Sequence, residues 1–90
     1  MTVVYKLEIA TRAQHDLAKL DRTVLKIIQA RLQRLAEKAD EITHLPLTGQ
    51  YAGLYKLRVH GKYRIIYDLQ KNRQAIIVVR VGKRSDIYRD

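Results

Sequence analysis

The first predicted strand is an alternation of apolar and polar residues near the start of the chain. Residues Val3–Ile9 read VVYKLEI, so every second side chain in this stretch is apolar. A period of two is typical of a strand that is buried on one face. We therefore expect four side chains to point into a core: Val3, Tyr5, Leu7 and Ile9.

Two amphipathic helices are predicted after this strand. Thr11 and Gln14 have the spacing of a capping box, which predicts that the first helix begins at Thr11. Asp21 is a favourable N-cap and predicts a second helix that runs to about Ala39. The junction at Leu20–Asp21 makes the pair a tight helical hairpin. Each helix has one apolar face, formed by Ala13, Leu17 and Leu20 in the first and by Val24, Ile27, Ile28, Leu32 and Leu35 in the second.

The second half of the chain predicts a loop and a three-stranded meander. Residues 40–53 hold the only proline and two of the four glycines, which is typical of a connecting loop. Apolar runs separated by short turns then predict strands over 54–59, 63–69 and 75–81. The expected fold class is α+β in the order βααβββ, with the hairpin packed on one face of a small, mainly antiparallel four-stranded sheet.

Length and composition narrow the class of protein. Ninety residues predict a single domain over 1–90, and the absence of cysteine excludes disulfides and thiolate zinc sites. The histidines, at positions 15, 44 and 60, have no metal-ligand spacing, so no cofactor is expected. No apolar run has the length of a membrane span, and no signal peptide is evident. We expect a soluble protein of the cytoplasm.

Charge indicates the kind of partner. The chain has 18 Lys and Arg against nine Asp and Glu, and residues 54–90 contribute +7 of the net charge of +9. Such a field attracts phosphate-rich molecules. A solubilising surface and an acidic protein partner are the alternatives.

The excess of positive charge gathers on one predicted face. Period-two geometry places Lys56 and Arg58 about 7 Å apart on the face opposite the helices. Arg64 returns to that face on the neighbouring strand. The tail VGKRSDIYRD is expected to leave the last strand at Gly82, to fold over this surface, and to stay mobile until a partner orders it.

Cleavage of RNA is one chemistry that this cluster could support. Carboxylates that could hold magnesium are scarce in this half of the chain, which disfavours a metal-dependent nuclease. The 2′-OH of RNA can instead attack the adjacent phosphate, given a base, cations on the phosphate oxygens and an acid for the leaving 5′-oxygen. A tyrosine can stack on a base. The same side chains could also bind phosphate passively.

The segments LYKLRVHGKYRIIY and VVRVGKRSDIY resemble the RelE/ParE superfamily of toxins from type II toxin–antitoxin pairs. The resemblance covers nearly the whole chain and is closest to the RelE branch. RelE toxins cleave messenger RNA in the ribosomal A site without a metal and so inhibit translation. ParE toxins share the fold and poison DNA gyrase. The implied partners are an acidic antitoxin, bound in a hetero-oligomer, and the ribosome with its mRNA; no membrane is implied.

The resemblance implies a role for each of five residues. Lys56 would be the general base, and Arg58 would set the charge around it. Arg64 would stabilise the phosphorane, Arg84 would be the acid or would stabilise the leaving group, and Tyr88 would stack on the substrate base. Further RNA contacts are expected from other cations near the cluster: Lys62, Arg80, Lys83 and Arg89.

Two features differ from the usual RelE pattern. An arginine expected near Thr48 is absent, and Arg84 and Tyr88 lie closer together. Other readings stay open for single residues: Arg64 could pair with Asp68, and Tyr88 could be a frayed end. Lys56 and Arg58 could protect a sheet edge from aggregation, and His60 could be a plain turn residue. A ParE-like gyrase inhibitor and an inactive RNA-binding domain are the alternative functions.

Overall fold

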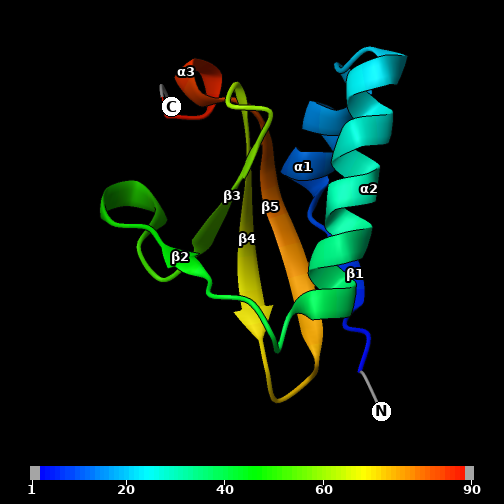
Figure 1. The fold of residues 1–90 in the computed structure, drawn as a ribbon. Coiled ribbons are helices and arrows are strands. Elements are labelled where there is room, and N and C mark those ends of the chain that lie inside the picture. The colour runs from blue at the N-terminus through cyan, green and yellow to red at the C-terminus, as the bar shows by residue number, and fades with distance from the viewer. Residues whose placement is uncertain (1–2, 89–90) are drawn as a thin grey trace.

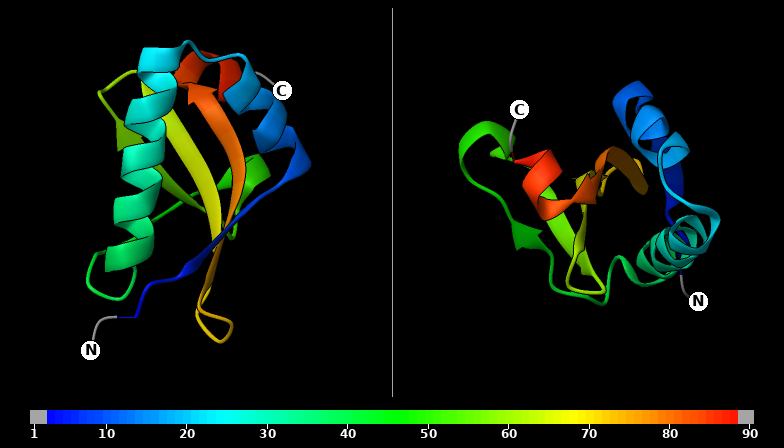
Figure 2. Two further views of the ribbon diagram at one scale, coloured as in Figure 1. Left: turned by 90° about the vertical axis from the view of Figure 1, so that its right-hand side faces the viewer. Right: turned by 90° about the horizontal axis from the view of Figure 1, so that it is seen from above.

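The computed structural model describes residues 3–88, which form a twisted sheet with a helical hairpin on one face (Figure 1). A short helix and a 3-10 turn lie on the other side of the sheet (Figure 2). In chain order the elements are β1 (Lys6–Ile9), α1 (Thr11–Ala18), α2 (Arg22–Lys38), β2 (Leu45–Pro46), η1 (Gly49–Tyr51), β3 (Tyr55–Val59), β4 (Tyr63–Gln70), β5 (Ala75–Lys83) and α3 (Arg84–Ile87).

The sheet confirms the predicted α+β class and the meander. Its strand order is β1-β5-β4-β3-β2, and β3, β4 and β5 are antiparallel neighbours. β1 runs parallel to β5, with Lys6 opposite Ala75. The sheet has five strands rather than the expected four, because Leu45 and Pro46 in the expected loop pair with β3. Pro46 is tolerated there because an edge strand does not need every backbone N–H.

One face of the sheet and the hairpin form the core. The predicted apolar face of α2 is confirmed: Ile28, Leu32 and Leu35 are buried, and Val24 and Ile27 pack at its margin. Burying a side chain of this size contributes about 1.5–3 kcal/mol to stability. The sheet contributes Val59, Ile65, Tyr67, Ile76, Val78 and Val81 to this core.

The first strand is shorter than predicted. It begins at Lys6, and Val3 is 39% exposed instead of buried. The reason is its partner, because β5 begins at Ala75 opposite Lys6 and leaves the preceding residues without a neighbouring strand. Tyr5 is buried, and Leu7 and Ile9 pack against the core, as predicted.

The two helix starts differ in how they are capped. The predicted capping box at Thr11 is wrong, because the N-cap is Ala10 and the Gln14 amide donates to the carbonyl of Ile9 at 2.9 Å. The Ala10 N–H bonds to Val78, so the strand ladder continues up to the residue before the helix. The predicted cap at Asp21 is confirmed, since its carboxylate accepts from the Val24 N–H at 2.9 Å.

The loop between α2 and β3 is fixed to the core by a histidine. His44 contacts the Ala39 carbonyl through Nε2 at 2.8 Å and the Tyr67 hydroxyl through Nδ1. Its ring meets those of Tyr55 and Tyr67 edge-on. Burial, followed by the effect of Tyr55, raises the pKa of Tyr67 to about 12. These contacts hold the loop against the end of α2 and against strands β3 and β4.

Among residues 3–88, no helix has the length and apolar character needed to cross a membrane.

Candidate functional site

An open groove of about 570 Å³ lies on the sheet face away from the helical hairpin. It is formed by β3, β4, α3 and the loop after β2. The groove brings together all five residues that the sequence placed at a site, together with two that it did not. Its lining consists of Leu47, Thr48, Lys56, Arg58, Arg64, Arg84 and Tyr88.

The strand register sets the positions of the cations. Arg58 on β3 lies directly opposite Arg64 on β4, and Lys56 lies opposite Ile66. Opposed residues of an antiparallel pair point to the same face, so the two arginines share the groove. Among the described residues, the ion pairs involve none of these cations or Arg84. The groove therefore carries a concentrated, uncompensated positive charge.

Arg64 is the most enclosed of the cations, with 9% of its surface exposed. Its Nη1 donates to the carbonyls of Gly61 and Tyr63, both at 3.1 Å. The alternative pairing with Asp68 does not occur, because that carboxylate accepts from the Gln70 amide instead. A guanidinium has five N–H groups, so Arg64 retains donors for an anion in the groove.

The tail forms a helical turn instead of leaving the sheet at Gly82. Gly82 pairs with Arg64, β5 continues to Lys83, and α3 begins at the next residue. Ile87 is fully buried beside Gly82 and anchors α3 to the sheet. The predicted break at Gly82 is therefore wrong. The signal that could have shown this is a single large apolar residue within a polar tail.

Tyr88 is placed at the edge of the groove by α3. Its N–H bonds to the Arg84 carbonyl at 3.2 Å, and 38% of its surface is exposed. Its ring lies 6.1 Å from that of Tyr51, at an interplanar angle of 68°. The Tyr51 hydroxyl also donates to the Ile87 carbonyl at 3.2 Å. Tyr51 was not among the predicted site residues, and its only signal in the sequence is an aromatic residue in a glycine-containing loop.

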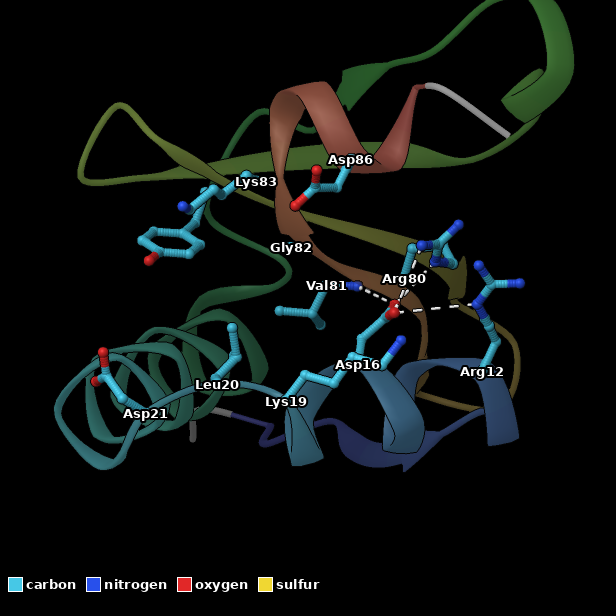
Figure 3. A pocket seen from close by; sticks show the side chains of 11 residues that line it. Arg12, Asp16, Lys19, Leu20, Asp21, Arg80, Val81, Gly82, Lys83 and Asp86 are labelled. Carbon is cyan, nitrogen blue, oxygen red and sulfur yellow. Dashed lines mark hydrogen bonds and ion pairs between the residues drawn. The ribbon is translucent and has the colours of Figure 1, made fainter.

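Two of the expected RNA contacts lie away from the groove, on β5 where it faces α1. Arg80 is buried and forms an ion pair with Asp16, with 2.8 Å between Nε and Oδ2 (Figure 3). The same carboxylate accepts from the Val81 N–H at 3.0 Å. Lys83 lines a second pocket of about 530 Å³ together with Arg12 and other residues of α1, β5 and α3.

The other two expected contacts are separate from both pockets or lie beyond the described chain. Lys62 and His60 line a small hollow between α2 and the β3–β4 turn. His60 has a positive φ of 51°, which fits its place in that turn. Arg89 lies outside the described residues. Within residues 3–88, no group of three His, Cys, Asp or Glu side chains is placed to hold a metal ion.

The arrangement is suited to binding a nucleotide through both its phosphate and its base. Arginine forks bind phosphate oxygens in two-point contacts, and an exposed tyrosine provides a face for a base. Thr48, near which an additional arginine was expected, does line the groove. The groove therefore lacks the additional arginine that the resemblance implied.

The sequence and the fold of this chain both match those of known proteins. Residues 7–88 match the family described as the ParE toxin of the type II toxin–antitoxin system parDE. Toxin RelG of Mycobacterium tuberculosis is 29% identical over 86 residues, which cover 94% of this chain and 97% of that protein.

Two solved structures show the same fold. The toxin–antitoxin complex RelBE2 of Mycobacterium tuberculosis matches with a TM-score of 0.80 at 26% identity, covering 96% of this chain and 98% of that chain. The isolated RelE toxin of E. coli matches with a TM-score of 0.72 at 28% identity, covering 93% and 90%. The chain therefore belongs to the ParE toxin family of type II toxin–antitoxin systems, within the RelE/ParE superfamily.

Proposed function

We propose that this toxin is a metal-independent endoribonuclease that cleaves messenger RNA in the A site of the ribosome. The observation that carries the proposal is the groove, in which Lys56, Arg58, Arg64, Arg84 and Tyr88 meet without an acidic partner in the described chain. These are the residue types that attack by a 2′-OH requires. A gyrase-directed toxin has no evident need for this set on one surface.

Each step of the proposed reaction uses one side of the groove. Lys56 takes the proton of the 2′-OH, the O2′–P bond forms, and Arg58 and Arg64 stabilise the pentavalent phosphorane. The P–O5′ bond then breaks, and Arg84 donates a proton to the leaving O5′, directly or through a water molecule. The products are a 2′,3′-cyclic phosphate and a 5′-hydroxyl. Tyr88 stacks on a base and keeps the attacking and leaving oxygens in line.

The partner that neutralises the toxin would be an acidic antitoxin. The RelBE2 structure, which shares the fold, is a toxin–antitoxin complex. In this chain a pocket between α2 and β3 has an apolar floor that includes Leu35 and Leu57, and Ile42 at its margin is 39% exposed. Arg31, Arg34 and Lys38 surround it. An amphipathic segment with acidic residues on its polar face would complement this surface.

The test of the nuclease uses ribosomes programmed with a defined mRNA. The purified toxin should cut the A-site codon and leave a 2′,3′-cyclic phosphate. A single 2′-deoxy nucleotide at the scissile position should abolish the cut, because it removes the nucleophile. Lys71→Ala, which removes an exposed cation in the β4–β5 turn, serves as the control and should cut at the wild-type rate.

Three results would contradict the proposal: a 3′-hydroxyl product, cleavage of the deoxy substrate, or no cleavage at all. In the last case a supercoiling assay with gyrase would test the alternative that the family name suggests. RNA that binds but is never cut would instead indicate an inactive RNA-binding domain.

A further inference from the structure

We propose that Tyr51 is a positioning residue that holds Tyr88 at the edge of the groove, and that Asp16 and Arg80 fix it in place. The inference rests on the proposed function, because it concerns where Tyr88 presents its ring to a base. Tyr51 does not line the groove itself. Its effect on the reaction would therefore pass through Tyr88.

The first contact is with the backbone directly before Tyr88. Tyr51 ends η1, and its hydroxyl donates to the Ile87 carbonyl at 3.2 Å. The last carbonyls of a helix have no partner within that helix, and α3 has only four residues. The hydroxyl of Tyr51 therefore satisfies a group that the helix itself cannot satisfy. It ties the end of α3 to a segment 36 residues earlier in the chain.

The second contact is between the rings. The centroids of Tyr51 and Tyr88 are 6.1 Å apart and their planes are inclined by 68°. This edge-to-face geometry is a favourable arrangement for two aromatic rings. It restricts the Tyr88 ring on one side while 38% of the residue remains exposed. A restricted ring holds a stacked base in one orientation, which would keep the attacking and leaving oxygens aligned.

The third contact fixes Tyr51. Arg80 Nη1 donates to the Tyr51 hydroxyl at 3.4 Å, so this oxygen accepts one hydrogen bond and donates another. Arg80 is held by Asp16 through Nε at 2.8 Å and Nη2 at 3.4 Å, and both residues are 8% exposed (Figure 3). Asp16 also accepts from the Val81 N–H. Asp16 therefore holds the Arg80 guanidinium in the position from which it donates a hydrogen bond to the Tyr51 hydroxyl.

The kinetic test compares Tyr51→Phe with Tyr51→Ala in the ribosome-dependent cleavage assay. The first variant keeps the ring and loses only the hydroxyl, so we expect kcat to fall about 5-fold with KM unchanged. The second loses both contacts and should fall further. A matched control is Tyr5→Phe, which loses a hydroxyl that is bonded to Asp40 at 2.6 Å and not to α3.

A double-mutant cycle separates positioning from general destabilisation. In a Tyr88→Ala background, Tyr51→Phe should reduce kcat no further, because the residue through which it acts is gone. Tyr5→Phe should leave kcat unchanged in both backgrounds. Additive losses for Tyr51 and Tyr88, or an equal loss for Tyr5→Phe, would overturn the inference.

A second measurement is independent of any nuclease activity. The Tyr88 N–H bonds to the Arg84 carbonyl at 3.2 Å, so its hydrogen exchange reports whether α3 is formed. Exchange should be faster in Tyr51→Phe than in the wild type and unchanged in Tyr5→Phe. If the wild type cuts no RNA, the proposed function fails, while this exchange still decides whether Tyr51 holds α3. Unchanged exchange in Tyr51→Phe and Tyr51→Ala would refute the positioning role.

Discussion

Arg58 on β3 and Arg64 on β4 are direct cross-strand partners in the antiparallel sheet. Like charges in this position repel one another and lower the stability of the sheet. The same repulsion gives the groove its attraction for an anion, because a bound phosphate would relieve it. The pair thus links a cost in folding to the binding of a phosphate.

Replacing the exposed member of this pair should stabilise the protein. We expect Arg58→Gln to raise the free energy of unfolding by about 0.2–1 kcal/mol in low salt. The gain should shrink at about 1 M salt, where charges are screened within a few ångströms. Urea denaturation followed by circular dichroism measures both values. Lys71→Gln, in an exposed turn, is the control, and a loss of stability in Arg58→Gln would contradict the repulsion.

Arg84 should matter for the reaction far more than for the fold. Its side chain is exposed and lines the groove, so Arg84→Ala removes little packing. If it stabilises the leaving oxygen, kcat for mRNA cleavage should fall about 10²-fold, equivalent to roughly 3 kcal/mol in the barrier. Single-turnover cleavage on programmed ribosomes measures this. A wild-type rate in Arg84→Ala would remove Arg84 from the mechanism.

Because Asp16 and Arg80 are a buried ion pair, removing one charge should lower the free energy of unfolding more than removing both. Asp16→Ala leaves a buried guanidinium without its carboxylate, and we expect it to lower the free energy of unfolding by about 3–5 kcal/mol. The double variant Asp16→Asn with Arg80→Met removes both charges and keeps an acceptor for the Val81 N–H. It should be clearly more stable than Asp16→Ala in urea denaturation. Equal losses would show that charge burial is not the cause.

Alkaline pH should weaken the fold through Tyr67. Burial, followed by Tyr55, raises the pKa of its hydroxyl to about 12, whereas the unfolded value is about 10. The folded state therefore binds the proton more tightly. The resulting stabilisation is complete below about pH 10 and is lost as the pH rises towards about 12.

The size of this effect can be measured by comparison with Tyr67→Phe. The variant lacks the titrating group, so its stability should fall less steeply between about pH 10 and 12. The difference between the two curves should reach at most about 2–3 kcal/mol. Tyr5 titrates in the same direction, since its hydrogen bond to Asp40 raises its pKa, and it contributes equally to both curves. Parallel curves would contradict the assignment to Tyr67.

Much of the fold could be predicted because its signals are local. The period of two in β3 and β4 and the period of 3.6 in α2 each follow from neighbouring residues alone. The pairing of β1 with β5 could not be predicted, since it joins residues about 70 positions apart, such as Lys6 and Ala75. β2 has only two residues, too few for any periodicity.

The site was predicted only in part, for two physical reasons. Alternation and the family resemblance identified the cations of β3 and β4, which the groove brings together. The contact of Tyr51 with Ile87 depends on how a loop folds over the sheet, and no local pattern encodes that. Arg80 was predicted to contact RNA, but its guanidinium is buried and paired with Asp16, which lies 64 positions earlier in the chain. No local pattern encodes that pairing either.

The parallel pairing of β1 with β5 has a consequence for the order of events during synthesis. β1 leaves the ribosome early, but its partner residues, Ala75 to Val78, emerge only after every other strand. β1 must therefore wait for its partner strand, since pairing between distant segments pays its chain-closure cost before any contact rewards it. Arg64, the groove cation of β4, likewise lacks its β5 neighbour Gly82 until then. The groove therefore cannot form before β5 and α3 have been synthesised, because α3 supplies Arg84 to its lining.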